Sequence, residues 1–417
     1  MELPELDRKP AYNYCALPLA NYASRPDISH GRIHDEPESK YRTCFQRDRD
    51  RIIHAGAFRR LKYKTQVFVY HEGDHYRTRL THSLEVSQIA RTLSRSLFVN
   101  EDLAEAVALA HDLGHTPFAH LGEHALKDCM KSYGGFDHND QSLRVLTHLE
   151  NKYPRWVGLN LTWETLEGIA KHNGPIIKKD ADAMGRAWKK AHLSETLYDV
   201  QKKIDLRLNT YASLEAQIAA LSDDIAYNNH DVEDGLRAGM FSIKDIAEVP
   251  LIGRQLKKIT DEYGNLSKEL LSAELVRAMI GEMVVDVFDE TCMRLDHMNI
   301  QTTEDVRDAK GACVDFSDKM TKEVDELREF LFTNMYRHYH LNRIGYKVDQ
   351  IIKGLFNAFM STPDTLPEKW QNKIKDAGGL TDDYVRARIV KDYIAGMTDR
   401  FAIREHSQLH DLQWDVK

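Results

Sequence analysis

Four histidines and two acidic residues lie within the fourteen residues from His111 to His124. His111 and Asp112 end a segment whose apolar residues, including Val107 and Ala110, recur with helical spacing, so both side chains should face the core. A buried histidine and a buried aspartate are costly unless they are paired or bound to a metal. Imidazole and carboxylate together suit a divalent ion such as Mn, Fe, Ni, Zn or Mg. The segment therefore predicts a metal site that needs further ligands from elsewhere in the chain.

The candidates for these further ligands are His82 and Asp223. Asp223, Tyr227 and Asp231 are spaced i, i+4 and i+8, so they share one face of a predicted helix. Small alanines at positions 216, 219, 220 and 226 line the same region, which is typical of a pocket wall. His82 starts another predicted helix, where a lone histidine is more often a cap or a satisfied core group.

The four histidines also fit a zinc chelate of the i, i+4 type, at positions 111/115 and 120/124. The HEXXH motif, however, requires a glutamate after the first histidine, and Asp112 stands there. Gly114 and Pro117 also interrupt the helix that such a chelate needs. The chain contains no Gly-Lys dipeptide, which excludes a P-loop, and no GxSxG or GxGxxG motif.

The elements that must position these residues are predominantly helical. Apolar periodicity predicts helices at 81–98, with Thr81 as N-cap, at 101–113, capped by Asn100, at 120–130 and at 213–229. Further amphipathic segments follow between 240 and 400, with breaks near Gly264, Pro363, Pro367 and Gly378-Gly379. Alternating strands are scarce, and 66–70 is the best candidate. The predicted fold is all-α with at most a minor β-hairpin.

Composition narrows the class of protein. The chain of 417 residues is 42% hydrophobic and carries a net charge of −8, so it can bury a core and has no global positive field for nucleic acid. The five cysteines lie far apart, which argues against a disulfide framework. The N-terminus does not resemble a secretory signal, and no apolar run reaches ~18 residues. We therefore expect a cytoplasmic protein that does not span a membrane.

One local charge asymmetry stands out. The segment 42–64 contains eight Arg or Lys residues against Asp48 and Asp50. It could be a site for a polyanion or an ordinary solvated helix face with alternating ion pairs, and the sequence favours neither. The first ~40 residues are rich in proline and predict an irregular arm.

The pattern His82, His111-Asp112 and Asp223 resembles the HD phosphohydrolase superfamily. The string HDLGHTPFAHLGE, preceded by RTRLTHSLEV and followed by SDDIAYNNHDVEDG, is similar to the deoxynucleoside triphosphate triphosphohydrolase branch, which includes bacterial dGTPases. FQRDRDRIIHAGAFRRLKYKTQVF, LREFLFTNMYRH and YIAGMTDRFA are also similar to dGTPase-like proteins, so the resemblance runs from about residue 30 to about 405. We expect an N-terminal arm at 1–44, an HD core at 45–240 and a C-terminal helical region at 241–417.

The resemblance implies roles for individual residues. The four metal ligands would be His82, His111, Asp112 and Asp223. The catalytic residues would be His120, its acidic partner Glu123, and His115, which matches a phosphate-contacting position. The substrate-binding residues would be Gln66 and Asp231 at the sugar 3′-hydroxyl, Arg79 at a phosphate, Tyr227 against the deoxyribose, and His138, Tyr336 and His338 along the pocket. Asp224 departs from the family's animal member, which has a phosphate-binding lysine there, so positive charge would have to come from 42–64 or Lys171.

The implied activity is hydrolysis of dGTP or several dNTPs to deoxynucleoside and inorganic triphosphate, with a divalent metal as cofactor. Two alternatives remain open: another HD phosphohydrolase (a nucleotidase, phosphodiesterase or single-stranded DNA exonuclease), and a non-catalytic nucleotide sensor. Family members form tetramers or hexamers, so a homo-oligomer is expected. The other expected partners are dNTPs and, weakly, single-stranded nucleic acid, with no membrane.

Overall fold

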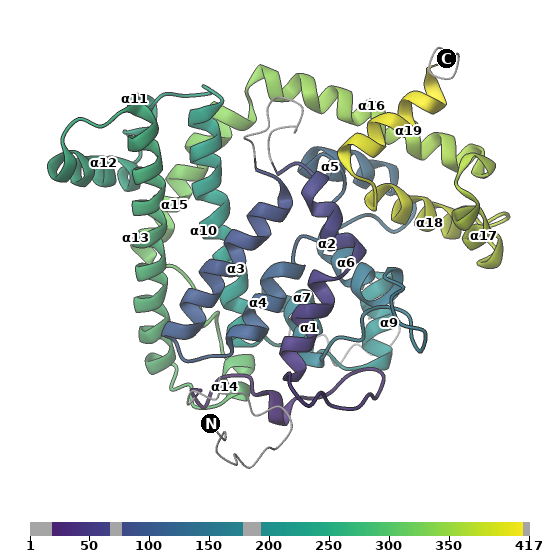
Figure 1. The fold of residues 1–417 in the computed structure, drawn as a ribbon, viewed down its shortest axis with the longest axis horizontal. Helices are drawn as coiled ribbons and strands as arrows, with labels where there is room; N and C mark the ends of the chain where they lie inside the picture. The colour runs from purple at the N-terminus through teal and green to yellow at the C-terminus, as the bar shows by residue number, and fades with distance from the viewer. Residues whose placement is uncertain (1–18, 67–76, 178–192, 412–417) are drawn as a thin grey trace, which may run out of the picture.

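The computed structural model describes residues 19–66, 77–177 and 193–411 (Figure 1). Within these ranges the backbone forms helices, and strand-like pairing is limited to three isolated β-bridges. The all-α fold predicted from the sequence is therefore confirmed. Apart from Gln66, the candidate strand at 66–70 lies outside the described residues. Among the described helices, none is long and apolar enough to cross a membrane.

Helix α4 (Glu101–Ala110) lies at the centre of the fold, and from Leu103 onward all of its residues except Glu105 are buried. Its start is confirmed, because the Asn100 side chain accepts a hydrogen bond from the Leu103 amide. The helix ends at Ala110 rather than 113, and His111 is its C-cap. The residues of the predicted metal site therefore lie where a buried helix gives way to a turn.

Helices α3 (Arg79–Ser96) and α10 (Leu214–Arg237) pack against each other and against α4. Thr81 is not the N-cap of α3, as the sequence predicted. The helix begins two residues earlier, after extended Thr78, and the Thr81 hydroxyl donates to the Thr78 carbonyl. Helix α10 continues beyond the predicted end at 229, because its last two turns still bury apolar side chains such as Val232.

The remaining helices surround this centre in three groups, each with its own packing. One apolar cluster joins α4 to α1 (Cys44–Ile53), α2 (Gly56–Arg60), α6 (His138–Arg144), α7 (Trp163–Lys171) and α9 (Glu195–Lys203). The largest cluster joins α3, α4 and α10 to α11 (Ile243–Ile246), α12 (Pro250–Tyr263), α13 (Lys268–His297), α14 (Thr303–Asp308) and α15 (Asp318–Leu331). A third cluster joins α5 (Ala119–Cys129) to α16 (Tyr339–Ser361), α17 (Glu368–Asp376), α18 (Asp383–Ala395) and α19 (Asp399–His410).

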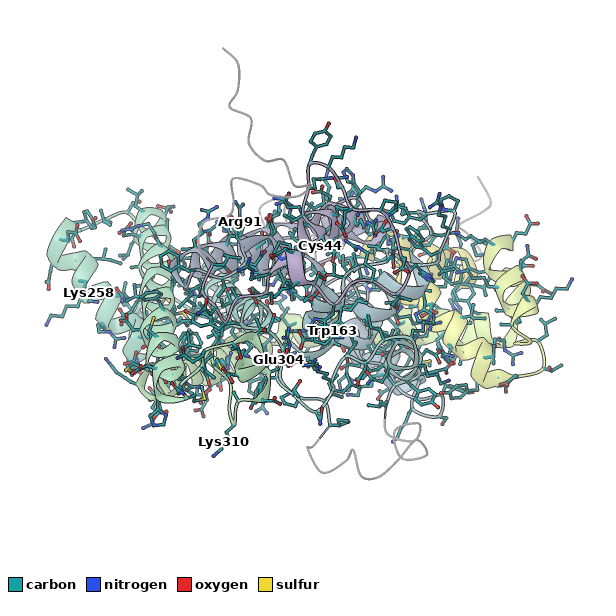
Figure 2. The ribbon with its side chains drawn as sticks, turned by 90° about the horizontal axis from the view of Figure 1, so that it is seen from below. Cys44, Arg91, Trp163, Lys258, Glu304 and Lys310 are labelled. Atoms are coloured by element: carbon teal, nitrogen blue, oxygen red, sulfur yellow. The ribbon has the colours of Figure 1, made fainter. Side chains whose placement is uncertain are left out.

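The helices α12 and α13 lie at one end of the molecule, and α16–α19 lie at the other (Figure 1). Seen from below, Lys258 on α12 marks the first end, and Trp163 of α7 lies between it and the C-terminal helices (Figure 2). The chain breaks predicted at Gly264, Pro363, Pro367 and Gly378-Gly379 all fall between α-helices, and Pro363 begins the short 3-10 helix η7 (Pro363–Thr365). Helix α5 follows the turn that begins at His111 and Asp112, and it packs against the C-terminal helices α16–α19.

Candidate active site

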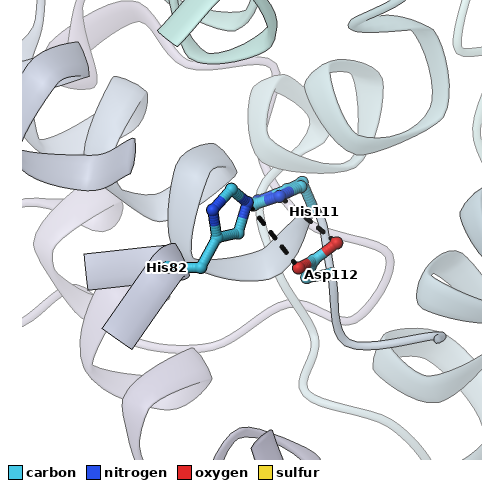
Figure 3. Close-up of side chains that lie close together, drawn as sticks. All are labelled: His82, His111 and Asp112. Atoms are coloured by element: carbon cyan, nitrogen blue, oxygen red, sulfur yellow. Dashed lines mark ion pairs between the residues drawn. The ribbon is translucent and has the colours of Figure 1, made fainter. Parts of the chain in front are cut away.

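Three of the four predicted metal ligands gather into one buried cluster (Figure 3). His82 comes from the first turn of α3, and His111 and Asp112 follow the C-terminal end of α4. The candidate ligand atoms of these three side chains all lie within 4.8 Å of one another. Asp223, from the middle of α10, brings Oδ1 to 2.8 Å from His82 Nε2 and to 3.5 Å from His111 Nε2. Packing of three helices thus unites residues that lie 141 positions apart in the chain.

One ring nitrogen of His111, Nε2, is available to bind a ligand. Its Nδ1 lies 2.6 Å from the Ala108 carbonyl, to which only an N–H can donate. In the neutral ring, which is the form that binds a metal, that bond leaves Nε2 with a lone pair, and this buried atom has no hydrogen-bond partner. Although burial lowers it, the carboxylates of Asp112 and Asp223 raise the pKa of His111, so the cluster favours positive charge.

His82 is oriented in the same way by a residue to which the sequence assigned no role. His230 Nε2 lies 2.7 Å from a carboxylate oxygen of Glu85, which can only accept, and burial lowers the pKa of His230. A neutral His230 therefore presents a lone pair at Nδ1, which lies 3.2 Å from His82 Nδ1. His82 must then donate from Nδ1, which turns the lone pair of Nε2 toward Asp223. Helical spacing could have found His230, since it follows Asp223 by seven positions.

These side chains fit a divalent cation. His82 Nε2 and Asp223 Oδ1 lie 2.8 Å apart, and when His82 is neutral with its proton on Nδ1, both atoms are acceptors that a shared cation would satisfy. Ligands bound at ~2.0–2.2 Å on adjacent positions of one ion lie ~3 Å apart. The spacing of His82 with Asp223, and of His111 with Asp112 at 3.3 Å, is of this order. Two imidazoles with two carboxylates suit the same range of divalent metals that the sequence indicated.

A second cluster lies beside the first and contains His115, His120, Glu123 and His138. Glu123 Oε1 lies 2.9 Å from His138 Nδ1, and Oε2 lies 3.4 Å from His120 Nδ1. Although burial raises it, the hydrogen bonds from His120 and His138 hold the pKa of Glu123 well below its ordinary range. The His115 and His138 rings stack at 4.0 Å between centroids. The His120 side chain is 60% exposed, so it alone of the four opens widely to solvent.

His115 connects the two clusters. Its Nε2 lies 3.2 Å from Asp112 Oδ1, and its Nδ1 lies 3.9 Å from Glu123 Oε2. Burial, with the charge of Arg79 adding to it, lowers the pKa of His115 well below its ordinary value, so the ring is neutral. Its buried Nδ1 has no hydrogen-bond partner. The structure therefore places an unsatisfied imidazole nitrogen between the metal-type residues and Glu123.

A third group consists of Tyr227, Tyr336 and Asp231. The Tyr336 hydroxyl donates to Asp231 Oδ2 and shares a short hydrogen bond with the Tyr227 hydroxyl. Burial raises the pKa of Asp231 to about 8, although the hydrogen bond from Tyr336 lowers it. Gln66 is buried as well, and its Oε1 has no partner. These contacts join α10 to the π-helical segment η6 (Phe332–Tyr336), which follows α15. Tyr227 lies one turn and Asp231 two turns along α10 from Asp223.

His338 is not joined to this group. Its ring caps the start of α16 by accepting from the His340 amide, and it stacks on the His340 ring. The contacts found for His338 within the described ranges are local ones of this kind. The predicted substrate role of His338 therefore rests on the resemblance alone.

The cations around the site differ from what the sequence indicated. Arg79 is buried and donates to Asp112 Oδ2 at 2.6 Å, so a carboxylate already holds the predicted phosphate ligand. Asp224 pairs with Arg328 at 2.7 Å, which brings an unpredicted cation next to Asp223. Lys171 cannot supply charge to a substrate, because it is buried in an ion pair with Glu167.

The basic segment 42–64 divides into two parts. Arg42, Arg47, Arg49 and Arg51 all form ion pairs with acidic side chains, as expected of an ordinary charged helix face. Beyond α1, Arg59 and Lys62 are exposed, whereas Lys64 is buried. The ion-pair interpretation therefore holds for the first half of the segment.

A strained turn lies between His115 and His120 of the second cluster. Phe118 and Ala119 have φ angles of 63° and 55°, in the left-handed region that costs non-glycine residues energy. Asp399, at the start of α19, accepts from the Phe118 amide at 2.9 Å and from the Thr65 amide at 2.8 Å. Lys64 donates to the carbonyls of Ala395 and His115, and burial lowers its pKa to about 7. We refer to Asp399 and Lys64, with these partners, as the clamp.

The clamp was not predicted from the sequence, although Asp399 lies within YIAGMTDRFA, one of the segments similar to dGTPase-like proteins. Asp399→Ala should lower the free energy of unfolding by ~1–3 kcal/mol, because it leaves two buried amides without an acceptor. Urea denaturation followed by circular dichroism measures this change. Asp376→Ala removes an exposed aspartate of α17 and should change stability by less than ~0.5 kcal/mol. Equal stability of the two variants would show that Asp399 does not hold the turn.

Comparisons with known proteins agree with this site. Residues 79–228 match the family model of the HD domain, and residues 314–408 match that of the phosphohydrolase-associated domain. The first range contains both histidine clusters, and the second contains Asp399 and Tyr336. The two matches therefore cover most of the site and the Asp399 side of the clamp, but not Lys64, His230 or Asp231.

Three curated relatives share nearly the whole chain. A Parvibaculum lavamentivorans protein is 52% identical over 402 residues, which is 95% of this chain and 99% of the relative. A protein of Caulobacter sp. strain K31 is 53% identical over 397 residues, with coverages of 95% and 97%. A Brucella anthropi protein is 51% identical over 392 residues, with coverages of 94% and 95%. All three are named deoxyguanosinetriphosphate triphosphohydrolase-like protein.

Proposed function

Because the chain belongs to the deoxyguanosinetriphosphate triphosphohydrolase-like family of HD-domain proteins, we propose that it hydrolyses dNTPs to deoxynucleosides and inorganic triphosphate. The observation that carries the proposal is the arrangement of His120 and Glu123 beside the metal-type cluster. A phosphohydrolase that only needs a metal-activated water does not require this second cluster.

In this proposal His82, His111, Asp112 and Asp223 hold the divalent ion. A divalent ion held there would supply charge to offset that of the phosphates and would activate a water. Arg79, held by Asp112, would contact a phosphate of the substrate. Neutral His115 offers its unpartnered Nδ1 to the same region.

His120 acts on the leaving group. Attack at the α-phosphorus expels the 5′-oxygen of the nucleoside, which leaves poorly unless it is protonated. His120 is exposed to solvent and can approach that oxygen, while Glu123, 3.4 Å from its Nδ1, stabilises the protonated ring. His138 holds the other oxygen of Glu123 and so keeps the carboxylate in place.

The products test the proposed function. The metal-loaded protein should convert dGTP, or another dNTP, to deoxynucleoside and tripolyphosphate, with no early pyrophosphate or orthophosphate on anion exchange. In oxygen-18 water the label should enter the triphosphate. Label in the nucleoside would show that water does not attack phosphorus. Release of orthophosphate or pyrophosphate would instead favour a nucleotidase or phosphodiesterase. Absence of turnover on every dNTP with several metals would favour a nucleotide sensor.

The tyrosine pair predicts selection of the sugar. Tyr227 is one helical turn from Asp223 and is fixed by Tyr336, so a rigid ring would lie against the deoxyribose. A 2′-hydroxyl placed there would be crowded and unpaired, which should favour dGTP over GTP by ~10–200-fold in kcat/KM. Tyr227→Ala should narrow this ratio.

The matched control for the sugar prediction is Tyr346→Ala, since the Tyr346 side chain is exposed on α16. This variant should keep the native ratio of kcat/KM for dGTP and GTP. Equal rates with GTP and dGTP in the unmodified protein would refute the assignment of Tyr227. So would an unchanged ratio in Tyr227→Ala.

A further inference from the structure

Two histidines of the C-terminal helix α19, His406 and His410, lie four positions apart and therefore share one face of the helix. Their ring centroids lie 4.5 Å apart. Two histidines at this helical spacing can bind one metal ion. Within the segment 111–124, Gly114 and Pro117 interrupt the helix that such a chelate needs, whereas α19 is continuous through both histidines. Neither residue has a role in the proposed reaction.

The two ring nitrogens converge on one point of helix α16. Helix α16 packs against α19 (Figure 1), and Gly354 is a residue of α16 that faces the two rings. A Cβ atom at position 354 would lie 2.8 Å from His406 Nε2 and 3.1 Å from His410 Nε2. Both nitrogens therefore face the same small space, which the glycine leaves free of side-chain atoms. The rings point together, as the ligands of one ion must.

The two rings are not used by the surrounding protein: in the part of the chain that the structure describes, neither forms a hydrogen bond or an ion pair. Charged neighbours in the sequence have partners of their own. Glu405 accepts from the Tyr393 hydroxyl at 3.2 Å, and Lys353, next to Gly354, pairs with Asp349 at 2.7 Å. The nitrogens that face Gly354 are therefore available to a ligand from solution.

The protonation state and the exposure of the pair suit metal binding. Burial lowers the pKa of His406, and the charge of His410 lowers it further. The neutral ring, which carries a lone pair, is therefore favoured at neutral pH, and this is the form that binds a metal. His406 is partly exposed and His410 is exposed, so an ion can reach both rings from solvent.

We propose that His406 and His410 form a second metal site, outside the candidate active site, for a late divalent transition ion such as Zn(II), Ni(II) or Cu(II). Two imidazole nitrogens suit these ions, whereas Mg and Ca prefer oxygen ligands. Water would fill the remaining coordination positions. The bound ion would link the last two turns of α19 and so stabilise the end of the helix that packs against α16.

Equilibrium dialysis of the full-length protein at fixed free Zn(II), followed by elemental analysis, tests the proposal. His410→Ala should weaken binding of one ion by at least ~10-fold, because even the loss of an orienting partner costs ~10–100-fold in metal affinity. The control is His297→Ala, which removes an exposed histidine from the last turn of α13, where Met293 stands four positions earlier. Equal zinc affinities in His410→Ala and the control would overturn the proposal.

A pair of glycine variants tests the geometry while both histidines are kept. Gly354→Ala places a methyl group beside the two nitrogens, so it should weaken binding of the same ion. Gly281→Ala, on α13, adds a methyl group where no other atom lies within 4 Å, and it should leave zinc binding unchanged. Equal zinc affinities in the two glycine variants would contradict the proposed site.

The double variant His111→Ala/His410→Ala shows that this site is separate from the candidate active site. Each single variant should lose one ion per chain, and the double variant should lose two. If both single variants lose the same ion, so that the double variant loses only one, the proposal is wrong. If His111→Ala alone keeps its zinc, the metal assignment of the active site fails, whereas the loss in His410→Ala still supports the second site.

Discussion

Replacing His120 by alanine should lower kcat by ~10²–10⁴ while metal content and dGTP affinity stay nearly unchanged. The expectation follows from the geometry, because His120 contacts Glu123 and lies outside the His82, His111 and Asp112 cluster. A general acid acts in the transition state, so its removal affects kcat rather than ground-state binding. Single-turnover kinetics and calorimetry with dGTP measure the two quantities separately.

Glu123→Gln provides the second half of this test. Glutamine keeps the shape of the side chain but removes the charge that stabilises protonated His120, so kcat should again fall. His124→Ala is the matched control, since His124 is exposed on the same helix and should not affect turnover. If His120→Ala and Glu123→Gln both turn over like the control, the proposed proton transfer is wrong.

Asp112→Ala should abolish binding of the divalent metal, which is the second large effect we expect. Asp112 lies 3.3 Å from His111 Nε2 and also accepts from Arg79. Its loss therefore removes a metal ligand and leaves the Arg79 guanidinium unpaired beside the metal ion. Elemental analysis after dialysis measures bound metal. Because Arg79 is buried, this variant could lose stability, and His111→Ala tests the same site without unpairing Arg79.

A graded series distinguishes ligands from the residues that orient them. His230→Ala should lower metal affinity by ~10–100-fold, as removal of an orienting partner does, and thus less than loss of Asp112 or His111. Asp224→Asn, next to Asp223 but paired with Arg328, should retain the metal. Chelator competition provides the affinities. Full metal content in both Asp112→Ala and His111→Ala would remove the basis for the metal site.

Much of the candidate site was predictable because ligand chemistry and helical periodicity are local properties. His111-Asp112 stood at the end of an apolar helical segment, and Asp223, Tyr227 and Asp231 shared one face of another. Residue types then limited what those positions could do. The Asn100 cap was predictable for the same reason, since its acceptor lies three residues from its donor.

Only the tertiary structure showed which side chains satisfy one another. Lys171, predicted as a candidate phosphate ligand, is buried in an ion pair with Glu167. Arg328, to which the sequence assigned no role, forms an ion pair with Asp224. His230 orients His82, a contact between residues 148 positions apart. Asp399 and Thr65 are separated by 334 positions. The periodicity of apolar residues specifies which face of a helix is buried. The partner of a buried polar group, however, depends on how helices distant in the sequence pack against one another. That packing therefore decides the electrostatics of the site.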